Sequence, residues 1–297
     1  MKQLFVNADD FGLHGDINRA IASGVNKGRI QGISISANGA AFDGFLIKEL
    51  NNGGAALGVH LTWADETWLT GDGGLSRAMI MKHLAMNPSG FAIKLRQEAR
   101  AQIERLLDIG IRPDHVDSHQ HIHVLPRLWS ITRELAREYS IPRIRLPLTS
   151  SFGTIRRTPG AMFLQLLSRF RQREIPTAWP CAGIARSGRN TSGVIRRELE
   201  ASSSQTLELI VHPAYATASL SHRYRHWGYD WDSERAMLMD DHWPLLMEEC
   251  GYETCPEAIG RSGKEAGESD SCGAAISAPK SAEERSSVQR NIKYRSY

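Results

Sequence analysis

Five residues that can bind metal ions or move protons stand where strand-like segments of this chain end. Asp9 and Asp10 end the first such segment, His60 lies in GVHLTW, His119 in HVDSHQHIH and His212 in LELIVHP. Two imidazoles and one carboxylate are sufficient ligands for a catalytic divalent ion, and they leave positions open for water and a substrate oxygen. Asp10, His60 and His119 could supply this set. The pattern therefore predicts metal-assisted chemistry.

Each of these residues also has a structural interpretation. A single histidine such as His60 is more often half-buried and hydrogen-bonded to the backbone, and Asp9 with Asp10 before Phe-Gly could form a turn that caps the next helix. Two adjacent acids aimed at one place would repel each other unless a cation or a proton were shared. A metal site therefore explains the pair better than a turn does, and it makes His60 a ligand.

The stretch HVDSHQHIH holds four histidines within nine residues, which is too many for one ion. If the stretch were extended throughout, its alternate residues would share one face. We predict that His119 is the ligand and that Asp117 or another histidine orients it through the remaining ring nitrogen. Packing and helix capping explain His121 and His123 as readily as a functional role does.

The elements that carry these residues alternate between strands and helices. Strands are expected at residues 3–7, 33–36, 56–61, 115–118, 143–147, 179–185 and 207–212. Helical spacing of apolar residues is expected at residues 17–25, 42–50, 95–106, 127–138, 162–171, 194–201 and 233–250, with a long loop after the third strand and a bend at Pro244. This order predicts an α/β fold with a parallel sheet. Because no Gly-x-Gly-x-x-Gly follows the first strand, we expect a distorted TIM-like (β/α) barrel of seven or eight strands.

Such a barrel gathers its chemistry at the carboxyl ends of the strands, where the βα loops converge. The polar residues above lie at these ends, and Arg145 lies on the strand that follows His119. Arg145 could hold Asp9 ionised or touch the substrate. It could also be a wall residue paired with some carboxylate.

Composition divides the chain into a barrel domain at residues 1–255 and a tail at residues 256–297. The tail is rich in Ser, Gly, Glu, Lys and Arg, with almost no large apolar residues, so we expect it to be disordered.

The chain has a net charge of +3, and its Lys and Arg residues are scattered along the sequence. Aromatic residues make up 7%, and together these features argue against nucleic-acid binding. No apolar run reaches the length of a transmembrane segment, and the N-terminus is typical of a strand rather than a signal peptide. We therefore expect a cytoplasmic protein whose four cysteines are reduced.

Five motifs in one order, NADDFG, GVHLTW, HVDSHQHIHVLP, IRLP and VHPAY, resemble those of the YdjC family of carbohydrate deacetylases, which includes chitooligosaccharide deacetylase and the hopanoid-biosynthesis deacetylases. The resemblance spans roughly residues 1–255. It implies a distorted (β/α) barrel and a divalent ion held by an Asp and two His, which fall on Asp10, His60 and His119. It also implies a base at Asp9 and suggests an acid at His212. The tail matches nothing associated with the family.

Amide hydrolysis needs an activated water, a place for the oxyanion and a proton for the departing amine. We expect one Mg²⁺ or Zn²⁺ ion to activate the water, Asp9 to take its proton and His212 to protonate the amine. The predicted activity is hydrolysis of the N-acetyl group of an amino sugar or glycoconjugate, which releases acetate and a free amine. The sequence chooses neither the sugar nor the metal ion, and it leaves the formation of homodimers open.

Two rival functions remain at this point. Another metal hydrolase, such as a phosphoesterase, could use the same ligands but would usually want further Lys or Arg near the metal. A sugar-binding barrel without catalysis could lose Asp9 or His212, and both are present.

Several loop aromatics could stack on a sugar ring. They are Trp63, Trp68, Tyr215, Tyr224, Trp227, Tyr229 and Trp231. We expect most of them to pack beneath the loops and one or two near the mouth to contact substrate.

Overall fold

A computed structural model describes residues 1–71, 73–149, 159–175 and 178–255. The tail expected to be disordered lies outside these residues. Within them, eight strands form one sheet: β1 (Lys2–Phe11), β2 (Gly32–Ile35), β3 (Ala56–Leu61), β4 (His115–Ser118), β5 (Arg143–Ile144), β6 (Cys181–Ala182), β7 (Thr206–Val211) and β8 (Tyr252–Thr254).

The sheet is parallel throughout and runs in the order β5-β4-β3-β2-β1-β7-β6. Its two outer strands approach each other beyond β5, where Thr149 forms a single parallel bridge with Cys181 of β6. The Cys181 N–H donates to the Leu148 carbonyl at 2.6 Å. The sheet therefore curls into an incompletely closed barrel, and the predicted distorted (β/α) barrel is confirmed.

Strand β1 is long because it pairs with two other strands along one of its edges. Its first residues pair with β8, from Lys2 opposite Tyr252, and β2 takes over from Asn7 opposite Gly32. On its other side β1 pairs with β7 from Gln3 onward. The β8 strand was not expected from the sequence.

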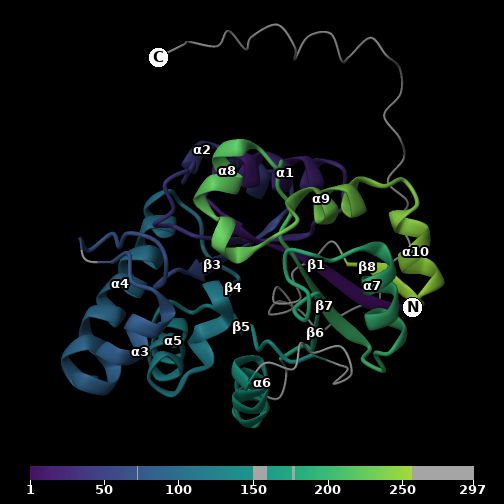
Figure 1. Cartoon of the computed structure of the whole chain (residues 1–297). Helices are drawn as coiled ribbons and strands as arrows, with labels where there is room; N and C mark the ends of the chain where they lie inside the picture. The colour runs from purple at the N-terminus through teal and green to yellow at the C-terminus, as the bar shows by residue number, and fades with distance from the viewer. Residues whose placement is uncertain (72, 150–158, 176–177, 256–297) are drawn as a thin grey trace, which may run out of the picture. The chain divides into compact units, whose positions relative to one another are not determined.

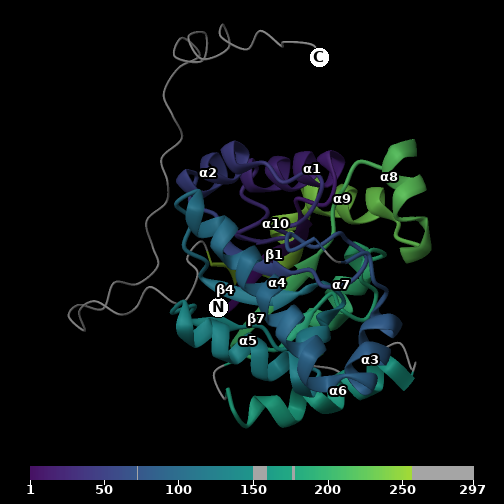
Figure 2. The same ribbon diagram turned by 90° about the vertical axis from the view of Figure 1, so that its left-hand side faces the viewer.

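Helices pack on the outside of the curled sheet (Figure 1). Those in the described residues are α1 (Gly15–Asn26), α2 (Gly44–Asn52), α3 (Arg77–Met86), α4 (Pro88–Asp108), α5 (Pro126–Glu138), α6 (Pro159–Gln172), α7 (Ser192–Glu200), α8 (Ala218–Arg223), α9 (Trp231–Met239) and α10 (Trp243–Glu249), with 3₁₀ turns η1 (His119–Val124) and η2 (Arg225–Trp227). The turned view shows the α3, α4 and α5 group, in which α4 contacts both α3 and α5 (Figure 2). None of the helices in the described ranges has both the length and the apolar character needed to cross a bilayer.

Local capping sets several of these helix starts. The Asp43 carboxylate accepts hydrogen bonds from the first backbone N–H groups of α2, and Asn87 caps α4, which has Pro88 in its first turn. The apolar periodicity of α1 buries Ile17 and Ile21 against the sheet. Sequence and local chemistry therefore agree at these elements.

Two helical expectations were wrong. The expected long loop after β3 contains α3, in which only Ile80 and Leu84 are buried while neighbouring methionines are exposed, so it has little apolar periodicity. The expected single helix over residues 233–250 is two helices, because Asp240 is extended (ψ 134°) and ends α9. Pro244 lies in the first turn of α10, where its missing N–H costs nothing, rather than at a bend.

Beneath the carboxyl ends of the strands, alternate residues form a buried polar layer. Its members come from six strands or the residues directly after them: Asn7, Asp9, Ser34, His60, His115, Asp117, Arg145 and Glu208. Asn7 Nδ2 donates to Ser34 Oγ at 2.9 Å, and the Ser34 hydroxyl donates to Asp117 Oδ2 at 2.8 Å. Buried polar groups are tolerated when they pair with one another, and this layer supports the site above it.

Gly58 leaves room for this layer. A Cβ at Gly58 would lie 2.2 Å from the ring of His115, whose Nε2 is 3.0 Å from Ser34 Oγ. Gly58→Ala should displace the ring and lower the free energy of unfolding by about 1–3 kcal/mol, as measured by guanidinium unfolding. Gly15→Ala is the matched control, because nothing lies within 4 Å of the added methyl group. Equal stability of the two variants would contradict the packing argument.

Candidate metal and active site

The end of β1 is bent so that two neighbouring aspartates reach the same site. Ala8 lies opposite Ile33 and Phe11 opposite Ile35, so β1 contains an extra residue relative to β2. Such a bulge redirects side chains that would otherwise alternate between the two faces. Asp10 adopts the left-handed conformation (φ 70°) that the bulge requires, which aspartate tolerates better than most residues.

Asp10, His60 and His119 converge as the sequence predicted. Asp10 Oδ1 lies 3.3 Å from His60 Nε2 and 3.0 Å from His119 Nδ1, and one ligand atom of each residue lies within 4.8 Å of the others. All three side chains are buried. Asp10 Oδ2 and His119 Nε2 are buried without a hydrogen-bond partner among the described residues.

The charges of this triad favour a cation. Burial would raise the pKa of Asp10, but His119 and His60 hold it well below its usual value. Burial would lower the pKa of His60, yet Asp117, Asp9 and Asp10 raise it to about 10. The pKa of His119 rises to about 9 for the same kind of reason, chiefly because of Asp10. A site that attracts protons this strongly also attracts a divalent ion, and its oxygen and nitrogen donors fit one.

The partner that orients a ligand differs from our expectation. Asp117 lies opposite His60 in the β3–β4 register, and its Oδ1 is 2.7 Å from His60 Nδ1, so it orients His60 rather than His119. Strand β4 ends at Ser118, and the chain then turns through Gln120 (φ 55°) and His121 (φ 54°). This turn takes the later histidines off the shared face that an extended stretch would have given them.

His123 has the structural role. Its Nδ1 is 2.8 Å from Ser118 Oγ and its Nε2 is 2.8 Å from the Arg145 carbonyl, so both ring nitrogens are satisfied inside the protein. Its pKa falls to about 4, mainly through burial. His121 has no such pair, because its Nδ1 is buried without a partner in the described structure.

Arg145 joins three carboxylates beneath the triad. Its Nη1 lies 2.7 Å from Asp9 Oδ2 and also contacts Asp117, while its Nε donates to Glu208 Oε1 at 2.9 Å. Burial would raise the pKa of Asp9, but the Arg145 guanidinium lowers it below its usual value. These contacts agree with two of the interpretations considered for Arg145: it lies against Asp9, whose ionised form it favours, and it is a buried wall residue paired with carboxylates.

A second group of metal-ligand types, Asp9, His60 and Asp117, also converges. Arg145 already lies against both of its carboxylates. The guanidinium supplies the positive charge there, so these residues favour one metal position, at Asp10, over two.

His212 follows the last residue of β7 and faces Glu234 of α9. Its backbone N–H donates to Glu234 Oε2 at 2.5 Å, and its Nδ1 lies 3.7 Å from the same oxygen. Burial would lower the pKa of His212, but Glu234, with Asp10 and Asp9 farther away, raises it. The imidazole is thus favoured in its charged form close to the triad.

Sequence reasoning missed three supporting residues. Ser34 and Glu208 belong to the polar layer, and Glu234 holds His212. The two-residue period of strands could have revealed Glu208, because it shares the face of β7 on which His212 follows four residues later. Glu234 carries no such signal, since it comes from a helix whose packing only the tertiary structure defines.

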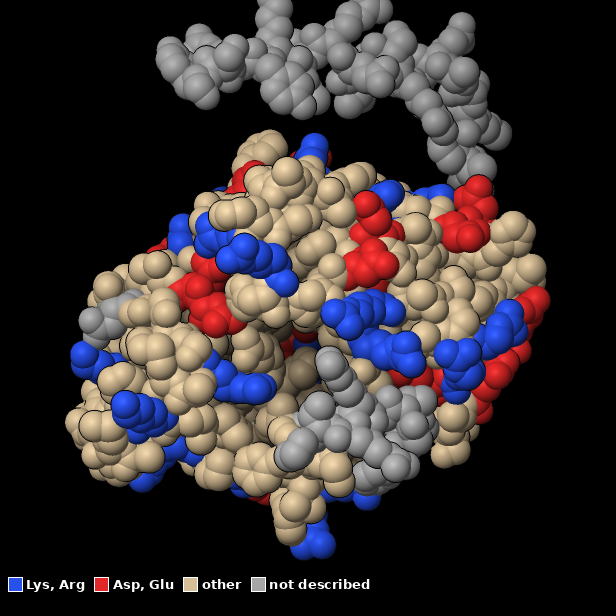
Figure 3. All heavy atoms as spheres, viewed as in Figure 1, with Lys and Arg blue, Asp and Glu red and all other residues tan. Residues whose placement is uncertain are grey.

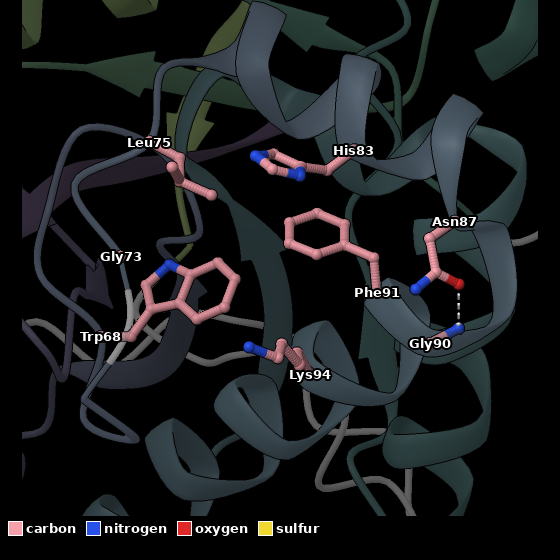
Figure 4. Close-up of a pocket in the computed structure, with 8 residues that line it drawn as sticks. All are labelled: Trp68, Gly73, Leu75, His83, Asn87, Gly90, Phe91 and Lys94. Carbon is pink, nitrogen blue, oxygen red and sulfur yellow. Dashed lines mark hydrogen bonds between the residues drawn. The ribbon is translucent and has the colours of Figure 1, made fainter.

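The loop aromatics divide into two groups. Trp63 and Trp68 are buried beneath the loop after β3, and Tyr224 and Trp231 are buried as well, so most of these aromatics pack inside the protein as expected. Trp68 lines a cavity of about 550 Å³ with Phe91, His83 and Lys94, and no triad residue lines this cavity (Figure 4). Trp227 and Tyr229 instead contact His119 and His212 of the site.

Comparison with known sequences places the chain in a family. A model of the family described as YdjC-like protein matches residues 3–249. The chain is 30% identical over 149 residues to a carbohydrate deacetylase of Clostridium beijerinckii, covering 47% of this chain and 58% of the relative. It is 32% identical over 143 residues to a chitooligosaccharide deacetylase of Escherichia fergusonii, covering 46% of this chain and 57% of the relative. The chain thus spans somewhat more than half the length of these relatives.

A solved structure from Enterococcus faecalis V583, proposed as a cellobiose-phosphate cleavage protein, has the same fold. Its TM-score is 0.62 at 19% sequence identity, and the match covers 86% of this chain and 97% of that one. With its family model matched over nearly all of the described residues, this chain belongs to the YdjC-like protein family.

Proposed function

We propose that this protein is a metal-dependent deacetylase that hydrolyses the N-acetyl group of an amino sugar or glycoconjugate. The observation that carries the proposal is the pairing of a cation-attracting triad with Asp9, which Arg145 holds ionised. His212, favoured in its charged form, completes the set. The names of the relatives, carbohydrate and chitooligosaccharide deacetylase, support this substrate class.

Asp10, His60 and His119 would hold the ion. When bound, a divalent ion polarises the acetyl carbonyl and makes an attacking water more acidic. Imidazole nitrogens suit Zn²⁺ better than Mg²⁺, and activity should be tested with each ion. Asp117 keeps His60 in place by accepting its Nδ1–H.

Asp9 acts as the general base. Its Oδ2 is paired with Arg145 and its Oδ1 accepts a hydrogen bond from Asn7 Nδ2 at 3.0 Å, so its position is fixed from two sides. Because its pKa is lowered, it remains ionised at neutral pH and can accept a proton from the attacking water.

His212 acts as the general acid. The amine is a poor leaving group and needs a proton as the carbon–nitrogen bond breaks. Glu234 raises the pKa of the imidazole, which favours its protonated form, and accepts a hydrogen bond from the backbone N–H of the same residue.

A phosphoesterase is less well supported. Holding phosphate at a metal site usually requires arginine or lysine side chains that can reach the ligand. Arg145 is buried and bound to three carboxylates, so it cannot serve this purpose. Basic and acidic side chains are interspersed over the face shown in Figure 3, without a single basic stripe.

The test is acetate release from a panel of N-acetylglucosamine conjugates. Metal-free protein should be inactive and should regain activity with Zn²⁺ or Mg²⁺. The panel includes chitooligosaccharides, N-acetylglucosaminyl lipids and nucleotide sugars, with a phosphomonoester as the contrast. Metal-dependent phosphate release without acetate release would overturn the proposal.

Glu234→Gln should move the alkaline limb of the kcat profile to lower pH by about one unit. Glu234 raises the pKa of His212, so removing its charge makes the imidazole lose its proton at lower pH. The acidic limb should stay in place, because it reports Asp9 and its water. Glu98→Gln is the matched control, since Glu98 is buried and bonded to Thr70 and Gln102 away from the site. An unmoved alkaline limb in Glu234→Gln would exclude His212 as the acid.

A further inference from the structure

Two aromatic residues of one short segment contact two different histidines of the site. The ring of Trp227 lies 4.8 Å from that of His119, and the ring of Tyr229 lies 5.3 Å from that of His212, measured between centroids. Their own rings are 5.5 Å apart. Residues 227–229, which we call the aromatic clip, therefore extend from the metal triad to the proposed acid.

The clip is fixed by its backbone. Gly228 between the two aromatics is left-handed (φ 62°), which lets both neighbours face the site. Its carbonyl accepts a hydrogen bond from Arg189 Nε at 2.5 Å, and the N–H of Asp230, two residues later, donates to the Gly188 carbonyl at 2.6 Å. The clip is thus tied to residues 188–189, which lie between β6 and α7.

The two aromatics are held by different contacts. Trp227 stacks on Tyr224 at 4.3 Å while lying against His119, and its Nε1 is buried without a hydrogen-bond partner in the described structure. Tyr229 packs on Gly188, where a Cβ would lie 2.1 Å from its ring, and against His212. In the described structure its hydroxyl makes no hydrogen bond, although Asp10, Asp9 and Glu234 are near enough to act on it electrostatically.

A phenol in this position is a neutral hydrogen-bond donor. Burial, with Asp10, Glu234 and Asp9, raises the pKa of Tyr229 well above its usual value, so the hydroxyl keeps its proton. The nearby carboxylates would repel the negative charge that develops on the acyl oxygen during the reaction. A hydroxyl donor already in place offsets this repulsion.

We infer that Tyr229 is a further catalytic residue, whose hydroxyl donates a hydrogen bond to the acyl oxygen of the bound acetamide as that oxygen becomes an oxyanion. The contacts of the Tyr229 ring with His212 and Gly188 hold the hydroxyl in position, and the hydroxyl transfers no proton. This inference rests on the proposed deacetylase function.

The test uses Tyr229→Phe, which keeps the ring contacts and removes only the hydroxyl. It should lower kcat by about 10²-fold with KM nearly unchanged, and metal content and thermal midpoint should equal those of the wild type. Tyr139→Phe is the matched control, because its hydroxyl donates to Glu104 Oε1 on the surface.

Binding gives a readout independent of turnover. A methylphosphonamidate of glucosamine, whose phosphoryl oxygens stand in for the oxyanion, should bind Tyr229→Phe about 10²-fold more weakly by calorimetry. Glucosamine should bind both proteins equally.

An active wild type with an unchanged Tyr229→Phe variant would overturn the inference. A rise in KM alone would also overturn it, because it would mean that the Tyr229 hydroxyl binds a hydroxyl group of the sugar. A wild type that releases no acetate would instead overturn the proposed function.

Discussion

Replacing Asp9 with asparagine should lower kcat by about 10²- to 10⁴-fold while the protein keeps its metal ion. Asparagine cannot accept the proton of the attacking water, and Asp9 is not needed to complete the triad of Asp10, His60 and His119. The fold should survive, because Arg145 retains Asp117 and Glu208 as partners. The measurement is metal content by elemental analysis beside the deacetylation rate.

Added metal should not rescue Asp9→Asn at any concentration. A base is missing in this variant rather than a ligand. Recovery of the rate with excess ion would show that Asp9 holds the metal and that its assignment as the base is wrong.

Asp10→Asn should fail in the opposite way. Asp10 Oδ1 is the atom that both His60 and His119 approach, and its negative charge is what gathers positive charge at the triad. The variant should lose metal affinity by about 10²-fold or more and should be partly rescued by excess ion. Titration of metal-free protein with Zn²⁺ or Mg²⁺, followed by the rate at each concentration, measures both effects.

The two aspartate variants serve as controls for each other. They differ by one position in the chain and make the same chemical change. If Asp9→Asn lost the ion and Asp10→Asn kept it, the two roles would be reversed.

Much of the architecture can be read from the chain because it depends on local patterns. Seven of the eight strands in the described residues and most helices were predicted close to their observed positions, since apolar periodicity and capping residues act within a few neighbours. The convergence of Asp10, His60 and His119 also followed from the sequence. Parallel strands of a barrel end at one mouth, so polar residues at those ends must meet.

Elements with weak patterns were missed for physical reasons. Helix α3 exposes most of its apolar residues, and the short strand β8 exists only because the first residues of β1 leave an edge for it. The break between α9 and α10 depends on Asp240, whose extended backbone no local signal indicates.

The sequence by itself determined which residues could form a metal site and that they would meet at one end of a parallel barrel. The tertiary structure decided which partner each of them has. The register of β3 and β4 places Asp117 beside His60, and the bulge at Asp10 lets two adjacent aspartates contact different partners. Arg145 and Glu234 reach Asp9 and His212 from elements far away in the chain. Side-chain identity and spacing fix the available chemistry, whereas charge pairing in a buried layer depends on distances of a few ångströms that only packing sets.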